Sequence, residues 1–459
     1  MIIEFDSELI KKCQKNAPRY TSYPTADRFT IEYNYKKHLL NIETYKNNIL
    51  NDPISLYIHI PFCNTLCLFC GCNKIITNNK SSIKKYLVYL KKEIDLYMNL
   101  INKKLDLIQL HFGGGSPSWV DIDDLESLMI FLKNNFNFDK IKEVSIEIDP
   151  RHCSKEYIRQ IKRLGFNRIS LGVQDFDLKV QKAVNRIQTL DETKDIIDMA
   201  KELSFDSINI DLIYGLPFQT LSSFEQTIDK VITLKPDRIA LFNFAHIPSI
   251  FMPQTRLNEN DLPTADEKLK ILQFSVTKLN SSGYWFIGMD HFALPTDELA
   301  IAALNKTLQR NFQGYSTFSD TAMISFGLSS IGYLINNYYQ NVKDLNTYYT
   351  MLDNNVLPIL RGVDLTYDDK IRKYVIEQIM CQYYLNYSKL NEKFNFNFKE
   401  YFNKELSNIE ELQKLELVIL SNDELIVTNK GKFLIRNIAS VFDYYLNQDV
   451  VTKRYSKSI

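Results

Sequence analysis

Cys63-Asn-Thr-Leu-Cys67-Leu-Phe-Cys70-Gly-Cys72 places four of the chain's seven cysteines within ten residues. The stretch directly follows an apolar run, Ser55–Ile60, whose β-branched residues predict a buried strand. A C-x3-C-x2-C spacing after a strand puts three thiolates on one tight loop, within reach of a single metal centre. The sequence therefore predicts a metal site at the carboxyl end of the first strand.

Short apolar runs alternate with amphipathic helical stretches from about residue 54 to 293, a pattern typical of a parallel sheet with crossover helices. The predicted strands are Ser55–Ile60, Leu107–Phe112, Val144–Ile148, Arg168–Val173, Ser207–Ile213 and Arg238–Phe244, with Trp285–Met289 as a candidate seventh. The predicted helices are Ile83–Leu100, Asp124–Lys133, Lys155–Leu164, Thr193–Leu203, Ser222–Thr233 and Ala265–Asn280. Six βα units predict an α/β fold, an open (β/α)6 three-quarter TIM-like barrel, with its chemistry at the carboxyl ends of the strands.

The sequence divides into three expected parts. Residues 1–50, which include the turn-rich segment Pro18–Thr25, predict an N-terminal arm lying on the barrel. Residues 51–293 predict the partial barrel, and residues 294–459 a mostly helical C-terminal domain. Near the end, a helix, a short hairpin and a further helix are predicted, as in a winged-helix-like end: Leu412–Leu420, Glu424–Thr428 and Lys430–Leu446.

Composition excludes several classes of function. The 55 basic and 55 acidic residues balance, which argues against nucleic acid and anionic membranes as partners. The start shows no basic segment before an apolar one, and no run of about 20 apolar residues occurs, so a soluble cytoplasmic protein is expected. Cys13, Cys153 and Cys381 are isolated and form no disulfide framework, which fits a reducing compartment.

The cysteine loop favours an iron–sulfur cluster over zinc. Structural zinc sites need a second pair of ligands farther along the chain, and the sequence contains no such pair. A four-iron cluster held by only three cysteines keeps one iron open to an exogenous group. Cys72 remains an alternative fourth ligand, although its spacing of two residues from Cys70 makes simultaneous ligation of one cluster awkward.

Several longer motifs resemble the oxygen-independent coproporphyrinogen III oxidase family of the radical S-adenosylmethionine (SAM) superfamily. They are Tyr57-Ile-His-Ile-Pro-Phe-Cys63, Cys70-Gly-Cys72-Asn-Lys, His111-Phe-Gly-Gly-Gly-Ser-Pro117, Ser145-Ile-Glu-Ile-Asp-Pro150, Gly165–Phe176, Asn209–Pro217, Gly288–Phe292 and Arg310–Tyr315. The likeness runs from Pro18 almost to the closing Arg454–Ile459. Arg19-Tyr-Thr-Ser-Tyr-Pro-Thr25 resembles the oxidase branch, whereas the related haem chaperones usually lack this arm.

The resemblance implies the cofactors and the residues that hold them. Cys63, Cys67 and Cys70 would ligate a [4Fe–4S] cluster, with Cys72 left free. Two molecules of SAM are expected. Residues matching the first SAM site are Tyr57, Gly114, Glu147, Ala245 and Ile331; those matching the second are Phe69, Gly115, Ser116, Gln174, Arg186 and Asp211. Beyond the cluster ligands, the sequence does not identify the catalytic residues.

The resemblance also implies the reaction. A 5′-deoxyadenosyl radical would take a hydrogen from a propionate of coproporphyrinogen III, and loss of CO2 and one further electron would leave a vinyl group. Two such decarboxylations would give protoporphyrinogen IX in haem biosynthesis. An electron-donating reductase or flavodoxin-type protein is the expected partner, and the enzyme is expected to be a monomer. A haem chaperone that binds haem without this turnover is the alternative. A structural zinc or cluster protein without catalysis is a second one, and a methyltransferase is a further one.

Two further predictions concern four histidines and an arginine of the N-terminal arm. His59, His111, His246 and His291 lie at or near strand ends, and their spacing resembles no compact ligand set, so hydrogen-bonded roles are favoured over metal ligation. Arg19, with Tyr20 and Tyr23, is a candidate to close over a substrate with four carboxylates, because arginine binds carboxylates bidentately.

Overall fold

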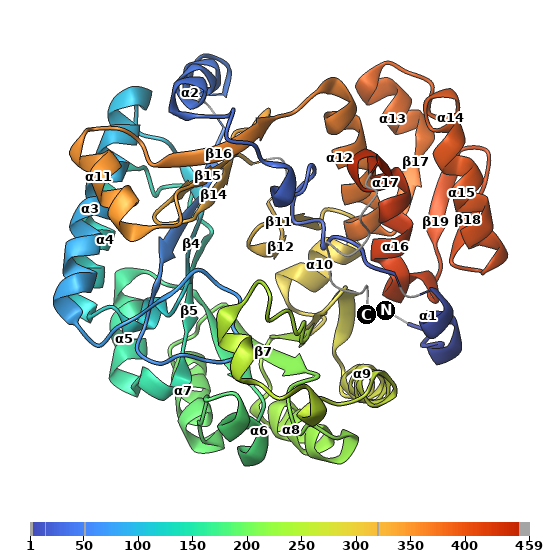
Figure 1. The fold of residues 1–459 in the computed structure, drawn as a ribbon, viewed down its shortest axis with the longest axis horizontal. Coiled ribbons are helices and arrows are strands. Elements are labelled where there is room, and N and C mark those ends of the chain that lie inside the picture. The colour runs from blue at the N-terminus through green and yellow to red at the C-terminus, as the bar shows by residue number, and fades with distance from the viewer. Residues whose placement is uncertain (1–2, 14, 50–51, 319–320, 449–459) are drawn as a thin grey trace. The chain divides into compact units, whose positions relative to one another are not determined.

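The structure is a computed structural model that describes residues 3–13, 15–49, 52–318 and 321–448, so the closing motif Arg454–Ile459 lies outside the described residues. The chain forms two compact units (Figure 1). The barrel unit comprises Phe29–Ile271 and Asp320–Asp364; the helical unit comprises Met1–Arg28, Leu272–Ser319 and Leu365–Ile459. The expected part boundaries at residues 50 and 293 stay a prediction.

The barrel unit contains the predicted parallel strands in sequence order. They are β1 (Ile54–Ile60), β4 (Leu107–Gly114), β5 (Glu143–Ile148), β6 (Arg168–Gln174), β7 (Ser207–Tyr214) and β8 (Arg238–Asn243), each hydrogen-bonded to the next and parallel to it. Their apolar side chains are buried, Leu56, Leu110 and Ile210 among them, which explains the nearly continuous apolar runs. The predicted open (β/α)6 architecture is confirmed.

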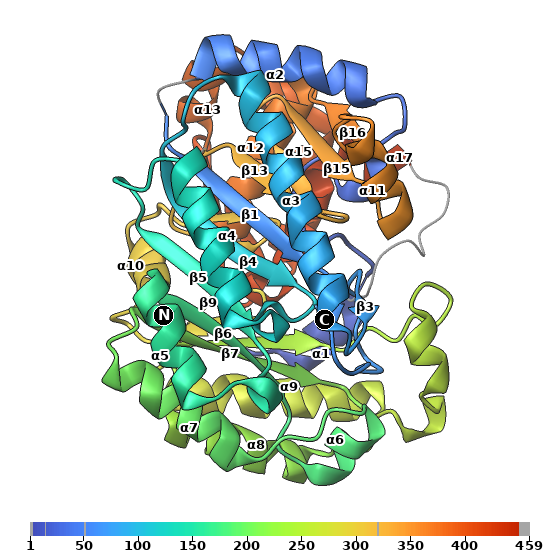
Figure 2. The ribbon, with the colours of Figure 1, turned by 90° about the vertical axis from the view of Figure 1, so that its left-hand side faces the viewer.

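Helices cover one side of these strands, as Figure 2 shows for α3, α4, α5 and α7. The helices are α3 (Lys80–Ile101), α4 (Ile122–Asn135), α5 (Lys155–Leu164), α7 (Leu190–Glu202) and α8 (Leu221–Leu234). α9 (Ala265–Ser281) begins in the barrel unit and continues into the helical unit. Local sequence fixes their ends: Thr189 and Glu192 form a capping box at the start of α7, and Gly165 ends α5 with φ +104°. A short helix, α6 (Leu178–Ala183), follows β6.

The sheet of the barrel unit extends beyond β1 in a way that the sequence did not predict. β13 (Met323–Phe326) pairs parallel with β1, and β14 (Ile331–Tyr333), β15 (Asn337–Asn341) and β16 (Ile359–Asp364) follow in antiparallel order. These strands are short, and β15 consists of Asn, Tyr and Gln residues only, so the segment carries no long apolar run. The expectation of a mainly helical pattern beyond residue 300 was therefore wrong for this segment.

The candidate seventh barrel strand is instead part of a hairpin in the helical unit. β9 (Trp285–Gly288) pairs antiparallel with β10 (His291–Ala293). Met289, in the turn between them, has φ +48°, a left-handed conformation that turns accommodate and strands do not. Trp285–Met289 therefore forms no further parallel βα unit.

The helical unit is mostly α-helical, as predicted, with a small antiparallel sheet. Its helices include α12 (Tyr367–Gln382), α13 (Tyr387–Phe394), α14 (Phe398–Tyr401), α15 (Asn403–Lys414), α16 (Ile435–Ala439) and α17 (Tyr444–Gln448). The sheet has the order β17 (Tyr384–Asn386), β19 (Glu424–Val427), β18 (Val418–Leu420). The predicted helix Leu412–Leu420 was wrong after Lys414, because Glu416 has φ +58° and β18 follows. The predicted helix Lys430–Leu446 is interrupted by 3-10 turns.

The N-terminal arm is anchored within the helical unit. The buried Arg436 side chain donates to the carbonyl oxygens of Ala17 and Pro18, and the Tyr20 hydroxyl donates to Asp443 at 3.0 Å. The Tyr23 hydroxyl accepts from the backbone nitrogen of Tyr444 at 3.0 Å. After Arg28 the chain enters the barrel unit, where α2 (Tyr35–Ile49) lies, so the first fifty residues are shared between the two units.

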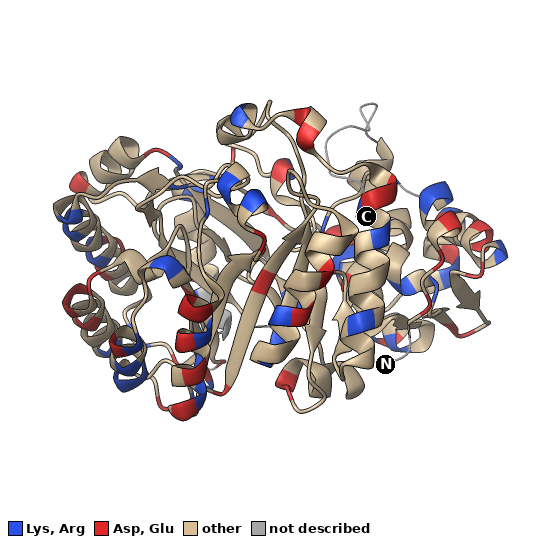
Figure 3. Ribbon diagram, turned by 90° about the horizontal axis from the view of Figure 1, so that it is seen from below, with Lys and Arg blue, Asp and Glu red and all other residues tan. Residues whose placement is uncertain are grey.

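Lysine and arginine lie interspersed with aspartate and glutamate along the helices (Figure 3). Among the described residues, each helix is too short or too polar to cross a membrane.

Candidate functional site

The cysteine loop begins at the carboxyl end of β1. β2 (Phe62–Cys63) pairs parallel with β3 (Ile75–Ile76), which closes the base of the loop. Cys67 is buried, whereas Cys63 and Cys70 are partly exposed. The loop therefore holds three thiols between the edge of the barrel and its interior, at the position that the sequence predicted.

Neighbouring loops brace the cysteine loop through its backbone. Leu68 N donates to Val184 O at 3.0 Å, and Asn185 Nδ2 donates to Leu66 O at 2.8 Å. Lys74 Nζ donates to the Cys70 carbonyl at 2.9 Å. These hydrogen bonds fix the backbone conformation of the loop without help from a bound metal.

Gln254, which the sequence analysis missed, joins two predicted site residues. Its buried Nε2 donates to the carbonyls of Phe69 at 3.1 Å and Ala245 at 3.2 Å, and its Oε1 accepts from Ile247 N at 2.6 Å. Phe69 lies in the cysteine loop and Ala245 follows β8. A single amide therefore ties the loop to the end of the last parallel strand.

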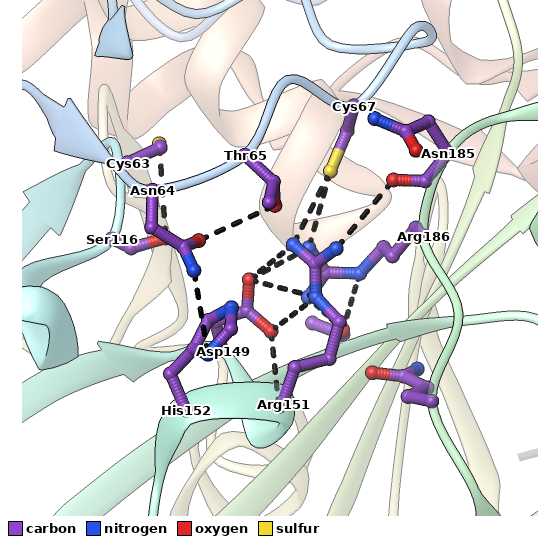
Figure 4. A network of polar contacts seen from close by, with 12 residues as sticks. Cys63, Asn64, Thr65, Cys67, Ser116, Asp149, Arg151, His152, Asn185 and Arg186 are labelled. Carbon is purple, nitrogen blue, oxygen red and sulfur yellow. Dashed lines mark hydrogen bonds and ion pairs between the residues drawn. The ribbon is translucent and has the colours of Figure 1, made fainter. Parts of the chain in front are cut away.

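Two arginines contact the Cys67 sulfur, and one aspartate binds both arginines (Figure 4). Arg151 Nη2 lies 3.6 Å from Cys67 Sγ, and Arg186 Nη1 lies 3.5 Å from it. Both guanidinium groups also bind the carboxylate of Asp149, at 2.6 Å and 3.1 Å. Burial alone would raise the pKa of Asp149, but Arg186 and Arg151 outweigh it and lower that pKa to about 2.

The glycine run Gly113–Gly115 at the end of β4 has no side chains, and its backbone lies next to Pro61 and Phe62 at the start of the cysteine loop. Gly114 has φ +116°, and a Cβ there would lie 2.5 Å from His59 Cε1. A Cβ on Gly115 would lie 2.8 Å from the Pro61 carbonyl oxygen, and Gly115 N donates to Ile60 O at 2.8 Å. A side chain fits at neither position, so this edge can present only backbone to a ligand.

Polar side chains at the ends of β1, β4 and β5 form one connected group. The Tyr57 hydroxyl lies 3.1 Å from His59 Nδ1, and the Tyr57 ring stacks on His111 with centroids 5.8 Å apart. His111 Nε2 lies 3.6 Å from Glu147 Oε1, and Gly114 N donates to Glu147 Oε2 at 3.1 Å. Burial would raise the pKa of Glu147, but His111 and Gly114 hold it below its usual range.

The ends of β6 and β7 bring together three residues of the predicted second SAM site. A Cβ added at Gly172 would lie 3.0 Å from both Arg186 Nη2 and Gln174 Nε2. Asp211 accepts from Asn209 at 2.8 Å and from Ser170 at 3.2 Å. Burial, with the nearby charge of Glu147, raises the pKa of Asp211 to about 6. Gln174, Arg186 and Asp211 thus border adjacent strand ends.

Other predicted residues have simpler surroundings. Ser116 Oγ donates to Cys63 Sγ at 3.7 Å. Ile331 is the first residue of β14, on the far side of β13 from β1. The Cys72 thiol donates to Cys70, which lowers the pKa of Cys70. His59, His111 and His246 are hydrogen-bonded, as the sequence predicted.

The arm arginine is paired within the helical unit, and its expected role of closing over the substrate stays a prediction. Arg19 Nη2 forms an ion pair with Asp290, in the turn between β9 and β10. The hydroxyls of Tyr20 and Tyr23 are engaged by Asp443 and Tyr444. Within the helical unit these three side chains hold the arm in place, because each already bonds to the unit itself.

The donor set fits an iron–sulfur cluster. Three cysteine thiolates on one loop match the donors of a [4Fe–4S] cluster, whose irons take thiolates at separate corners. A structural zinc site instead takes four ligands that converge on one ion.

Comparisons with known proteins agree with this geometry. Residues 57–231 match the family model described as radical SAM superfamily, and residues 365–434 match the HemN C-terminal domain. The chain is 44% identical over 463 residues to the oxygen-independent coproporphyrinogen III oxidase of Synechocystis sp., covering 100% of this chain and 98% of that protein. It is 42% identical over 457 residues to the Escherichia coli protein of the same name, covering 100% and 99%.

A solved structure is also similar over nearly the whole chain. The structure titled coproporphyrinogen III oxidase (HemN) from Escherichia coli, a radical SAM enzyme, superposes with a TM-score of 0.92. It covers 97% of this chain and 100% of its own, at 42% identity. The full-length identities and the shared fold together place this chain in the oxygen-independent coproporphyrinogen III oxidase family.

Proposed function

We propose that this protein catalyses the oxygen-independent oxidative decarboxylation of two propionates of coproporphyrinogen III to vinyl groups, giving protoporphyrinogen IX. The observation that carries this proposal is the position of Cys63, Cys67 and Cys70 on one loop at the end of β1, where Ser116 contacts Cys63 and Arg186 contacts Cys67. The two relatives and the solved structure compared above carry the oxidase name, so the haem-chaperone alternative is not supported.

The cofactors are a [4Fe–4S] cluster and SAM. When bound, they supply the one-electron chemistry of the reaction, and the protein binds, orients and shields them. We propose Cys63, Cys67 and Cys70 as the cluster ligands. The proposed first SAM site comprises Tyr57, Gly114, Glu147, Ala245 and Ile331, and the proposed second site comprises Phe69, Gly115, Ser116, Gln174, Arg186 and Asp211.

The charges of the site support these roles. Glu147 is ionised near neutral pH because its pKa lies below the usual range, so it can accept hydrogen bonds from the ammonium group of a methionine moiety. Gly114 lets the same moiety approach the backbone closely, and Gly115 does so for the second SAM. Arg186 offers a planar fork of donors that suits a carboxylate.

The substrate, the electron donor, the cellular compartment and the oligomeric state are part of the same proposal. Coproporphyrinogen III is the substrate, and an electron-donating reductase or a flavodoxin-type protein supplies the electron. All seven cysteines are free of disulfides, which supports a reducing compartment, and we propose the cytoplasm. We propose a monomer that engages neither nucleic acid nor a membrane, in keeping with its balanced charge.

Anaerobic reconstitution tests the proposed function directly. Protein loaded with iron and sulfide is mixed with dithionite, SAM and coproporphyrinogen III, and the products are separated by chromatography. 5′-Deoxyadenosine and protoporphyrinogen IX should appear together. Cys67→Ser should abolish both, whereas Cys13→Ser, outside the loop, should leave both unchanged. Haem binding without either product would support the chaperone alternative instead.

A further inference from the structure

The Cys67 sulfur differs from the other two cysteine sulfurs in the charge around it. Two guanidinium groups donate to it, from Arg151 at 3.6 Å and from Arg186 at 3.5 Å. Cys63 Sγ receives only the neutral hydroxyl of Ser116, at 3.7 Å. Lys74 donates to the carbonyls of Cys70 and Cys72, and, besides the hydrogen bond from Cys72, its single charge also lowers the pKa of the Cys70 thiol. Among the three sulfurs, Cys67 is the one that two guanidinium groups contact.

Asp149 holds Arg151 in the orientation that this contact needs. Arg151 Nε lies 2.9 Å and 3.2 Å from the two carboxylate oxygens, and Nη2 lies 2.6 Å from Oδ2. The side chains of Asp149 and Arg151 are only 4% and 11% exposed, so water screens the pair weakly. One carboxylate between two guanidinium groups leaves a net charge of about +1 beside the sulfur, by formal charges at neutral pH.

Arg151 and Arg186 differ in what else they can do. Arg186 also donates to the carbonyl of Gly172, at the strand end where the second SAM is proposed. Arg151 directs Nη2 at the sulfur, and its remaining Nη1 reaches only the Asn185 carbonyl at 3.5 Å. The Arg151 side chain is thus directed mainly at Asp149 and Cys67.

We propose that Arg151 is a positioning residue that raises the reduction potential of the cluster through Cys67. Hydrogen bonds to cluster sulfurs and nearby positive charge favour the reduced form, because reduction adds one negative charge. The electron comes from a low-potential one-electron donor and goes to the cluster, and no covalent bond forms or breaks at Arg151. This inference rests on the proposed function, since it requires the cluster to bind at this loop.

A redox titration followed by electron paramagnetic resonance tests the proposal. The reconstituted wild-type protein is compared with Arg151→Gln, which removes the charge, and with Arg151→Lys, which keeps it but loses the fork. Arg159→Gln is the matched control, because Arg159 is an exposed arginine that pairs only with Glu156 in the described contacts. Each protein is also checked for iron content and melting temperature.

At the potential where the wild-type cluster is half reduced, Arg151→Gln should show a ratio of reduced to oxidised cluster that is at least tenfold lower. For a one-electron couple, this tenfold change corresponds to a midpoint potential about 59 mV lower. Arg151→Lys should show a smaller shift, and Arg159→Gln none. An unchanged potential in Arg151→Gln with full iron content would overturn the proposal, as would an equal shift in Arg159→Gln.

Loss of the cluster is also decisive. If both Arg151 variants melt like wild type but retain no cluster, Arg151 is needed to hold the cluster and does not tune it, and the proposal is overturned. A wild-type protein that forms no [4Fe–4S] signal would instead overturn the proposed function. The two failures are therefore distinguished by the wild-type sample.

Discussion

Glu147 accepts a hydrogen bond from the backbone nitrogen of Gly114, with 3.1 Å between Oε2 and that nitrogen. The bond joins the end of β5 to the end of β4, and it helps to hold the pKa of Glu147 below its usual range. Gly114 itself has φ +116°, in the left-handed region. The bond that supports the charge of the proposed SAM site is thus made at a backbone conformation that only glycine adopts readily.

Gly114→Ala should therefore impair both stability and SAM binding. A Cβ at this position would lie 2.5 Å from His59 Cε1, in addition to the cost of the left-handed backbone. We expect a loss of about 3 kcal/mol in the free energy of unfolding, measured in urea. We also expect at least a tenfold weaker SAM affinity in equilibrium dialysis of the reconstituted protein.

Gly165→Ala is the matched control for this variant. Gly165 also has a positive φ, +104°, but a Cβ there meets nothing within 4 Å. We expect a cost of about 1–2 kcal/mol from the backbone alone, with SAM affinity unchanged. Equal costs for the two substitutions would contradict the role assigned to the contact between Gly114 and His59.

Local patterns in the sequence predicted the parallel strands well. The predicted strand Ser55–Ile60 differs from β1 by one residue, and the predicted Lys155–Leu164 coincides with α5. Both segments bury a regular set of apolar side chains, so periodicity alone identifies them. The cysteine loop was equally predictable, because its proposed ligands lie close together in the sequence.

Contacts between distant residues were missed because no local pattern marks them. Arg151 is 84 residues from Cys67, and Gln254 is 185 residues from Phe69. Arg151 directly follows the quoted motif that ends in Asp149-Pro150, and this adjacency was the one available signal. The partners of Gln254 are backbone carbonyls, which leave no trace in the sequence. Both contacts form only when the folded chain brings these distant residues together, so the sequence alone does not predict them.

Gln254→Leu should loosen the cysteine loop without unfolding the barrel. The substitution leaves the Phe69 and Ala245 carbonyls and the Ile247 amide without this partner, at an expected cost of about 1–3 kcal/mol. We expect the reconstituted variant to lose iron to a chelator several times faster than wild type, as followed by absorbance. Gln273→Leu, at an exposed position on α9, should lose iron at the wild-type rate. Equal rates for all three proteins would contradict the bracing role.

Glu93 should make stability depend on pH. This buried side chain of α3 accepts from Gly327 N, Asn341 Nδ2 and the Tyr348 hydroxyl, yet burial prevails and raises its pKa from 4.5 to about 7. The folded state keeps the proton after the unfolded chain has released it. The stabilisation is therefore complete below pH 4.5 and is lost as the pH rises through 7, by about 3 kcal/mol.

Urea unfolding of wild type and Glu93→Gln between pH 4.5 and 8 measures this effect. The variant cannot titrate at this position, so its unfolding free energy should fall less steeply with pH than that of wild type. Glu156→Gln, which removes an exposed carboxylate on α5, should keep the wild-type slope. Parallel profiles for wild type and Glu93→Gln would show that Glu93 does not titrate in this range.

Arg436→Met should release the N-terminal arm from the helical unit. The buried guanidinium donates to the carbonyls of Ala17 and Pro18, and losing it leaves two buried acceptors unpaired, at about 3 kcal/mol. Because the arm is then freed more often, trypsin should cleave after Lys15 and Arg19 several times faster than in wild type, as mapped by mass spectrometry. Arg163→Met, at an exposed position on α5, should leave these two cleavage rates unchanged. Wild-type rates in Arg436→Met would mean that the hydroxyl contacts of Tyr20 and Tyr23 hold the arm without Arg436.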